Sequence, residues 1–474
     1  MSIFNIHSET GTLRKLLIHS PDNGLGKVVP SKAQDWLFED IVHLDTIRRE
    51  EYDHYVKLLL YFLDPDKIKG KLKEVDDPSS GRVFYQPGHH RFHRSEHVIE
   101  LQWLLAELLV DDVLRSQMIA AVCAVEGCTH STQELLSNYS AVELASCFLS
   151  GMGNDKTILF APIPNFIFTR DIGIVVKDHL ILNKPAKIAR RREALLARYI
   201  FFHHPLFHSY RKNIIELQQN KPVFLMPEDD EESLITLEGG DIMMIAPGHL
   251  IIGISERTSA AAAAQLTEIV FAKQLVQKVS IVRIPAKRDY MHIDTIFTHV
   301  KKDVWVMMGL FSEQMNDHQG TAIERHLLGD RKEKAVVTQF HAASPDQPIH
   351  FSSLEGLLRD ISINDYGCAD VRIIFSGNNE YPYSVREQWT DSCNLLALKQ
   401  GVVVSYDRNE KTTAAFSNAG FHVVNVKDLI DDLENDRITI DRITDTVILM
   451  PSAELSRARG GFHCMSLPLN RDSD

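Results

Sequence analysis

A short supersecondary unit recurs four times after residue 155, and it constrains the fold of this chain more than any other feature. Each copy has a polar cluster, an apolar strand, a short turn and a second apolar strand. The polar clusters are Asp171, Glu238-Gly-Gly-Asp241, His292-Ile-Asp294 and Asp391-Ser-Cys-Asn394. Helical patterns lie between the copies, at 189–200, 260–276 and 313–328.

Repetition of one unit in a single chain predicts an α/β fold whose units stack radially, as in a propeller. The polar starts of the strands would then converge on a central site. The alternative is an ordinary α/β sheet whose hairpin turns happen to be alike. In that case only the expectation of radial stacking around a central site would be lost.

The chain before residue 152 has a different character. Residues 12–21 are a short apolar run that ends at Ser-Pro, which predicts a strand. From 45 to 151 helical patterns dominate. Apolar residues recur at the spacing of one helical face at Val98, Leu101, Leu105 and Leu108. Ser131-x-x-Glu134 and Ser140-x-x-Glu143 each predict a capping box that opens a helix. We therefore expect a helical domain at 45–151, inserted into a main domain formed by 1–44 and 152–474.

Charge and cysteine content exclude several classes of protein. The chain has 51 Lys and Arg against 64 Asp and Glu, a net charge of −13, so we expect no nucleic-acid partner, whereas a small cation would be attracted. The six cysteines are scattered and form no CxxC pair, which fits a reducing cytoplasm. No leader is evident, and no apolar run approaches the roughly 18 residues of a membrane span, so we expect no membrane partner.

Four histidines gather in a polar stretch of the helical region, at His89, His90, His93 and His97. Histidines at this density can bind a metal ion. No cysteine or carboxylate cluster completes such a site in the sequence, so we predict a solvated loop and no metal.

The C-terminal tail, 457–466, presents Cys464 in a basic stretch that contains Gly460 and Gly461. A thiol attacks as thiolate, and nearby cations lower its pKa, so Arg459 and His463 as neighbours indicate a nucleophile. A buried structural cysteine in a turn is the alternative interpretation of this stretch alone.

The strand starts and the tail together contribute several carboxylates, a histidine and a cysteine. Carboxylates would destabilise the oxyanion that a cysteine protease forms. They suit a planar cation instead, because the donor fork of a guanidinium pairs with carboxylate oxygens. This combination predicts attack on a guanidinium carbon.

Six segments resemble successive motifs of bacterial arginine deiminases, in the order and spacing of that family. They are PNFIFTRD at 164–171, LEGGD at 237–241, GISERT at 253–258, MHIDT at 291–295, REQW at 386–389 and RGGFHC at 459–464. Residues 6–14 and 36–40 resemble the opening of the family, so the likeness covers essentially the whole chain. It implies a five-fold pseudosymmetric β/α propeller with an α-helical bundle inserted after its first module. Two stretches, 64–97 and 339–370, depart from the family pattern.

The resemblance also assigns roles to residues. It implies that Cys464 is the nucleophile and His292 the general acid and base, with Asp171 and Asp294 gripping the guanidinium. Glu238, with Asp241 behind it, would orient and charge-stabilise the histidine. The clamp that receives the charged end of the amino acid matches Asn165, Arg190, Arg257 and Arg459. The resemblance implies no cofactor.

These residues predict hydrolysis of free L-arginine to L-citrulline and ammonia through a thiouronium on Cys464, by a cytoplasmic homo-oligomer. An amidinotransferase would need a second amine site, and the sequence reveals none. A deiminase for agmatine would leave the arginine clamp unpaired. A non-catalytic arginine-binding protein is the third alternative, and the intact set of cysteine, histidine and acids argues against it.

Overall fold

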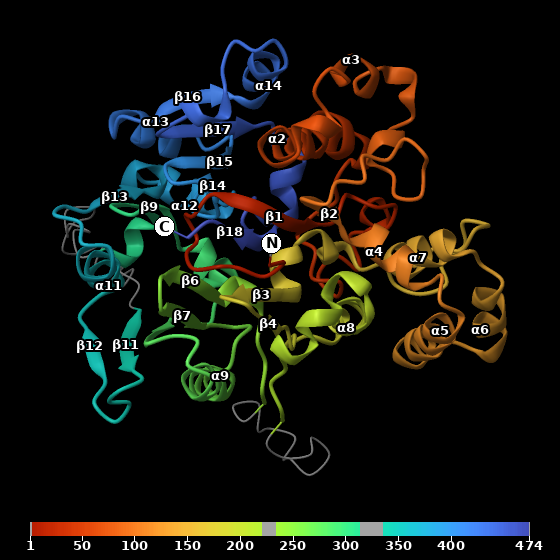
Figure 1. Ribbon diagram of the computed structural model, residues 1–474, viewed down its shortest axis with the longest axis horizontal. Coiled ribbons are helices and arrows are strands. Elements are labelled where there is room, and N and C mark those ends of the chain that lie inside the picture. Colours follow the sequence, from red (N-terminus) through yellow and green to blue (C-terminus); the bar gives the residue numbers. More distant parts are fainter. Residues whose placement is uncertain (1, 220–233, 313–334, 474) are drawn as a thin grey trace.

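The computed structural model describes residues 2–219, 234–312 and 335–473, and within them the chain is a mixed α/β protein (Figure 1), as predicted. The helical pattern at 313–328 lies outside these residues. The described strands form five separate sheets. In sheet order, the first sheet contains β18 (Leu467–Arg471), β1 (Leu13–Ile18) and β2 (Val98–Glu100), and the second contains β3 (Gly173–Val176), β4 (His179–Leu182) and β5 (Ile214–Ile215). The third sheet contains β12 (Ile349–Phe351), β11 (Val336–His341), β8 (Lys278–Arg283), β7 (His249–Ile254) and β6 (Ile242–Ala246). The fourth contains β13 (Arg372–Phe375), β10 (Val304–Met307) and β9 (Phe297–Lys301), and the fifth contains β14 (Leu396–Lys399), β15 (Val402–Tyr406), β17 (Thr446–Met450) and β16 (His422–Asn425).

All five sheets contain the same three-stranded unit. An antiparallel pair is joined by a third strand that runs parallel to the second member of the pair. The pairs are β18/β1, β3/β4, β6/β7, β9/β10 and β14/β15, and the third strands are β2, β5, β8, β13 and β17. The four predicted hairpins are confirmed, and so is the strand predicted at 12–21, which is β1. The fifth pair joins the two ends of the chain.

Three strands of these units are buried along their whole length. Every residue of β3, β6 and β15 is buried. A strand covered on both faces needs apolar side chains at successive positions, which is why these segments are continuous apolar runs in the sequence. Residues 339–370, where the sequence predicts a departure from the family pattern, include β12, and β11 and β12 extend the third sheet beyond β8.

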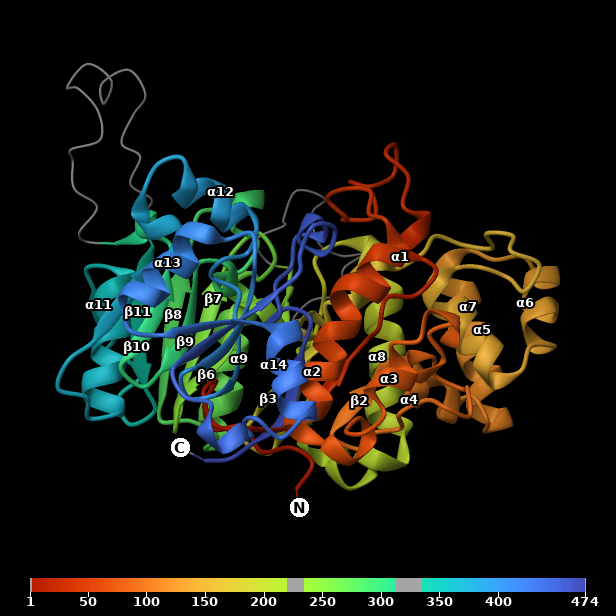
Figure 2. The ribbon, with the colours of Figure 1, turned by 90° about the horizontal axis from the view of Figure 1, so that it is seen from above.

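Helices surround the sheets. They are α1 (Leu44–Thr46), α2 (Asp53–Leu63), α3 (Leu72–Val75), α4 (Leu101–Leu108), α5 (Asp112–Glu126), α6 (His130–Ser137), α7 (Ala141–Ser150), α8 (Arg191–His203), α9 (Ala260–Ala272), α11 (Leu354–Asp360), α12 (Tyr383–Trp389), α13 (Glu410–Asn418) and α14 (Val426–Glu434). The helices predicted at 189–200 and 260–276 are α8 and α9. Two views place α5, α6 and α7 together at one end of the molecule, away from the sheets (Figures 1 and 2). Among the described helices, none has the length and apolarity needed to cross a bilayer.

Two details predicted for 45–151 are wrong. Val98 lies in β2 and not on the helix that begins at Leu101, because residues 98–100 pair with the free edge of β1. Helix α6 is capped by Thr129, whose hydroxyl accepts from the backbone N–H of Thr132 at 3.3 Å, so Ser131 is not the cap. The helix therefore begins two residues earlier than the sequence motif predicted.

The second predicted capping box is confirmed at the start of α7. The Ser140 hydroxyl accepts from the Glu143 N–H at 3.3 Å, and the Glu143 carboxylate accepts from the Ser140 N–H at 2.8 Å. Each side chain satisfies a backbone donor that the helix itself leaves unpaired.

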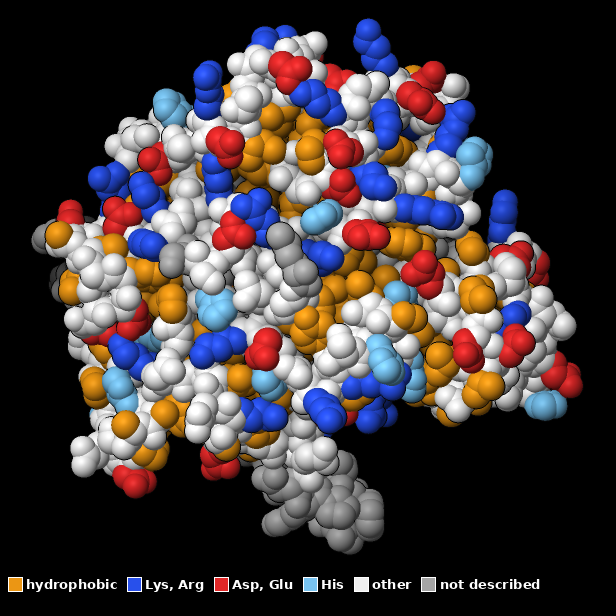
Figure 3. Space-filling model, in the orientation of Figure 1, with side chains coloured by type: hydrophobic (Ala, Val, Ile, Leu, Met, Phe, Trp, Pro, Cys, Tyr) orange, Lys and Arg blue, Asp and Glu red, His pale blue; other side chains and the backbone are white. Residues whose placement is uncertain are grey.

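Acidic and basic side chains are interspersed on the face drawn in Figure 3. The net charge of −13 is therefore not concentrated into one acidic patch on that face.

Candidate active site

The candidate site is built from the segments that lead into the first strand of each unit. These segments carry Asp171 before β3, Glu238 and Asp241 before β6, His292 and Asp294 before β9, Asn394 before β14 and Cys464 before β18. Hydrogen bonds and ion pairs join neighbouring lead-in segments to one another. The repeat detected in the sequence thus brings polar residues from five distant parts of the chain to one place.

Two glycines let these segments approach closely. A Cβ on Gly239 would lie 2.0 Å from the carbonyl oxygen of Arg170, and one on Gly240 would lie 2.6 Å from Nδ1 of His292. The segment that leads into β6 can therefore pass against the segments that lead into β3 and β9 only with glycine at both positions.

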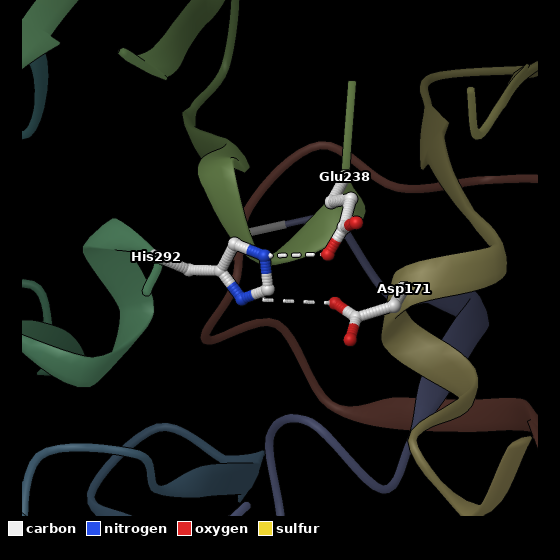
Figure 4. Close-up of side chains that lie close together, drawn as sticks. All are labelled: Asp171, Glu238 and His292. Atoms are coloured by element: carbon white, nitrogen blue, oxygen red, sulfur yellow. Dashed lines mark hydrogen bonds and ion pairs between the residues drawn. The ribbon is translucent and has the colours of Figure 1, made fainter. Parts of the chain in front are cut away.

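His292 lies between two carboxylates (Figure 4). Its Nε2 is 3.0 Å from Glu238 Oε2, and its Nδ1 is 3.8 Å from Asp171 Oδ1. Burial alone would lower the pKa of His292, but Asp171, the hydrogen bond to Glu238 and the charge of Asp241 together raise it to about 10. The imidazole is therefore a cation at neutral pH and can donate a proton.

Asp241 supports this histidine from behind. Its Oδ1 accepts from the Ile293 N–H at 3.0 Å, and its Oδ2 accepts from the Ser255 hydroxyl at 2.6 Å. Burial raises the pKa of Asp241 to about 6. Its contacts fix the backbone next to His292 and leave the imidazole directed at Glu238 and Asp171.

The Cys464 thiol faces carboxylates, contrary to the sequence-based expectation. Its Sγ is 3.4 Å from Asp294 Oδ2, and its backbone N–H donates to Asn394 Oδ1 at 3.0 Å. Burial and the negative charges of Asp294, Asp171 and Asp391 raise the pKa of this thiol well above its ordinary value. The prediction that Arg459 and His463 lower it is wrong, because His463 turns to other partners and Arg459 stacks on an indole ring.

Arg190 connects the carboxylates of the site. Its Nη1 donates to Asp171 Oδ2 at 3.0 Å and to Glu238 Oε2 at 2.8 Å, and its Nε donates to Glu193 Oε2 at 2.8 Å. Burial by itself would raise the pKa of Glu238, but the Arg190 cation and the hydrogen bond from His292 hold it well below its ordinary range. Glu238 is therefore a permanent anion beside His292.

Most of the residues predicted from the sequence line one cavity. They are Asn165, Asp171, Arg190, Glu238, Arg257, His292, Arg459 and Cys464. Asp241 and Asp294 are fully buried behind His292 and Cys464. The cavity has a volume of only about 30 Å³, which is small compared with an amino acid.

Polar atoms without hydrogen-bond partners divide into two groups around this site. Among the predicted site residues, three carboxylates have a buried oxygen without a hydrogen-bond partner: Oδ1 of Asp171, Oε1 of Glu238 and Oδ1 of Asp294. Three arginines of the same set have buried nitrogens without one: Nη2 of Arg190, Nε of Arg257, and Nε and Nη1 of Arg459. An unpaired buried polar atom costs about 1–3 kcal/mol. The site therefore suits a ligand with a cationic donor group and an anionic acceptor group.

Several supporting residues were not identified from the sequence. Behind Asp294, His463 Nδ1 lies 2.9 Å from Asp294 Oδ2 and its Nε2 lies 3.3 Å from Glu9 Oε2. Arg170 donates to Glu9 Oε1 at 2.8 Å. Asn394 belongs to the fourth polar cluster of the repeat, and the position of that cluster was the one indication in the sequence that it belongs with the others.

Asp171, Glu238 and His292 are also close enough to share a metal ion, and they are the sole such group among the described residues. Arg190 Nη1 already bonds to both carboxylates, so a cation is present where an ion would bind. We assign no metal to this group.

The family model for arginine deiminase matches residues 128–471, more than half of the chain. The chain belongs to the arginine deiminase family. The match runs from the end of α5 into β18 and includes all five lead-in segments. Relatives named arginine deiminase come from Bacillus cereus (28% identical, covering 98% of this chain and 98% of that protein) and from Borrelia recurrentis (28% identical, 99% and 98%).

Solved structures similar to this family member include SxtG, an amidinotransferase from Microseira wollei. It has a TM-score of 0.47 and 12% identity, covering 100% of this chain and 98% of that one. A dimethylarginine dimethylaminohydrolase adduct with S-methyl-L-thiocitrulline has a TM-score of 0.35 and 16% identity, covering 64% and 76%.

Proposed function

We propose that this protein hydrolyses free L-arginine to L-citrulline and ammonia. The observation that carries the proposal is that the unpartnered buried atoms of the predicted site residues are carboxylate oxygens and arginine nitrogens. L-Arginine carries a guanidinium at one end and a carboxylate at the other. Two further findings support the same substrate. The chain belongs to the arginine deiminase family, and its match to relatives named arginine deiminase covers nearly the whole length of those relatives.

Asp171 and Asp294 hold the substrate guanidinium beside Cys464. A guanidinium has a pKa above 12, so these acids orient and pair with the cation instead of deprotonating it. The bound cation also offsets the negative field that raises the pKa of the thiol. Arrival of the substrate therefore favours loss of the thiol proton to solvent, which leaves the thiolate that attacks the guanidinium carbon.

The charged end of the amino acid is received by Asn165, Arg190, Arg257 and Arg459. Arg190 is anchored through Nε and Nη1 to three acids and keeps Nη2 for a ligand. Asn165 is held by its bond from Nδ2 to the Trp36 carbonyl at 2.7 Å. Anchored donors lose little freedom on binding a carboxylate.

The reaction proceeds in two halves. The Cys464 thiolate adds to the guanidinium carbon, and the His292 imidazolium protonates the leaving nitrogen, so that ammonia departs and a thiouronium stays on sulfur. Neutral His292 then takes a proton from water as the water oxygen adds to the same carbon. Collapse of this adduct breaks the C–S bond and releases the ureido product. Glu238 orients and stabilises the imidazolium throughout.

We extend the proposal to the architecture of the protein, its location in the cell and its oligomeric state. The five like units and their meeting lead-in segments support a five-fold pseudosymmetric β/α propeller. In this arrangement the main domain is 1–44 and 152–474, and 45–151 is an inserted helical domain that also contributes β2 to the first sheet. The six free cysteines support a cytoplasmic location. The homo-oligomer stays a prediction from the family resemblance.

The test is to measure citrulline and ammonia released from L-arginine by the purified protein. We expect equal amounts of both, complete loss in Cys464→Ala, and no product from agmatine. Cys393→Ala is the matched control, since Cys393 is also buried near a lead-in segment but does not line the cavity. Folded wild-type protein that makes no citrulline, or that passes the amidino group to an added amine, contradicts the proposal.

A further inference from the structure

Trp389, the last residue of α12, has a large apolar side chain that the core does not cover. Its exposed fraction is 43%, although it lies next to the buried Arg459 of the candidate site. The Arg459 guanidinium carbon is 3.7 Å from the centre of the Trp389 ring. That distance is a close cation–π contact, and tryptophan is the strongest partner for one.

Arg459 is restrained on its other edge as well. Its Nη2 donates to the Asp289 carbonyl at 3.4 Å, and Gln388 Nε2 donates to the same carbonyl at 2.7 Å. Its Nε and Nη1 are buried and have no hydrogen-bond partner in the described ranges. The guanidinium is thus held by its face and by one nitrogen, while its other two nitrogens are available.

The indole ring is itself fixed, because α12 is anchored to α13. Glu387, two residues before Trp389 on α12, accepts from the backbone N–H groups of Lys411 and Thr412 on α13, each at 2.8 Å. It also accepts from the Thr412 hydroxyl at 2.6 Å. A rigid helix end therefore carries the ring on which Arg459 rests.

We propose that Trp389 is a positioning residue that sets the preference for guanidino substrates with an α-carboxylate, by stacking on Arg459 and holding its free nitrogens toward the cavity. The inference rests on the proposed function, which assigns Arg459 to the carboxylate clamp. An unrestrained arginine would have to be ordered by each substrate, at a cost in affinity. A substrate without a carboxylate gains nothing from this restraint.

The test compares Trp389→Ala and Trp389→Phe with wild type. In Trp389→Ala we expect KM for L-arginine to rise about tenfold, which corresponds to about 1.4 kcal/mol, while kcat stays within about twofold, because the substrate must then order Arg459 itself. Trp389→Phe keeps an aromatic face and restores most of the affinity. Agmatine, measured as a competitive inhibitor, should keep its inhibition constant in both variants. Adding Trp389→Ala to Arg459→Ala should have no further effect.

Val385→Ala is the control, since Val385 is 47% exposed on the same helix and has no place in the site. An unchanged KM in Trp389→Ala overturns the inference. So does an equal weakening of L-arginine and agmatine, which indicates a structural role, or an additive loss in the double variant. A wild-type protein that releases no citrulline contradicts the proposed function itself and is distinguishable from all of these.

Discussion

At the scale of single residues, the carboxylates around the site shift the pKa values of Cys464 and His292 in the same direction, with opposite chemical effects, and Asp171 acts on both. Negative charge raises the pKa of the thiol and of the imidazole alike. The free protein therefore holds a neutral thiol and a cationic histidine. Only the histidine is ready to act before a guanidinium arrives to offset the acids.

The titration of Cys464 tests this arrangement. Following the ultraviolet absorbance of the thiolate, wild type minus Cys464→Ser, should give a pKa above the ordinary value of about 8.5. Asp294→Asn should lower that pKa, because it removes the carboxylate 3.4 Å from Sγ. Asp178→Asn, at an exposed acid, should leave it unchanged. A thiol that titrates below its ordinary value in the free protein contradicts the geometry.

The stability of the protein should depend on His292 in a defined pH range. A histidine whose folded pKa is raised from 6.5 to about 10 stabilises the fold fully below about pH 6.5, and this contribution is lost as the pH rises through about 10. The difference in unfolding free energy between wild type and His292→Asn should therefore be largest near pH 6.5 and shrink toward pH 10. A difference that stays constant over this range would show that the imidazole is not charged in the folded state.

The sequence identified the members of the site better than their partners. The identities of Asp171, Glu238, His292 and Cys464 follow from the repeat and the family motifs. Side-chain contacts across the fold do not, so the expectation that Arg459 and His463 flank the thiol failed. Neighbours in sequence need not be neighbours in space when the chain is left-handed at Arg459 and turns at 462–465, as it does here.

At the scale of elements, the local patterns were predictive and the non-local pairings were not. All four hairpins were evident because two buried apolar runs joined by a short turn are contiguous in sequence. The parallel third strands depend on partners up to 82 residues away, as between Leu16 and Val98, and β2 is only three residues long. Its apolar residue Val98 fitted the helical spacing of the residues that follow it by coincidence.

The two predicted capping boxes provide a test at this scale. Ser140→Ala removes a cap that forms at α7 and should lower the free energy of unfolding by about 1 kcal/mol. Ser131→Ala affects a serine that caps no helix and should change it by less than about 0.5 kcal/mol. Chemical denaturation of both variants measures the difference. Equal losses would mean that α6 begins at Ser131 after all.

At the scale of the whole molecule, the site exists only when both ends of the chain are in place. The pair β18/β1 closes the first unit, and Cys464 enters the site just before β18. Glu9, near the N-terminus, lies between Arg170, which precedes β3, and His463, which precedes β18. It therefore connects the N-terminal residues to both of these segments. The five units therefore depend on one another for the chemistry.

Removal of this buried carboxylate should destabilise the molecule. Glu9→Ala leaves Arg170 and His463 without their shared anion, and breaking a buried ion pair in this way costs about 3–5 kcal/mol. Chemical denaturation measures the loss, with Glu134→Ala as the control at an exposed acid on α6. A loss in Glu9→Ala no larger than that of the control would contradict the role of Glu9 as a link between the chain ends.

The proposed mechanism depends most directly on a covalent bond between Cys464 and the guanidinium carbon of L-arginine. The measurement is acid quench of the protein during turnover of L-arginine labelled in the guanidino group, followed by peptide mapping. We predict label on the peptide that contains Cys464, with a mass increase equal to arginine less ammonia, and none in Cys464→Ala. Turnover that continues without label on the protein, or with label on another residue, would contradict the account.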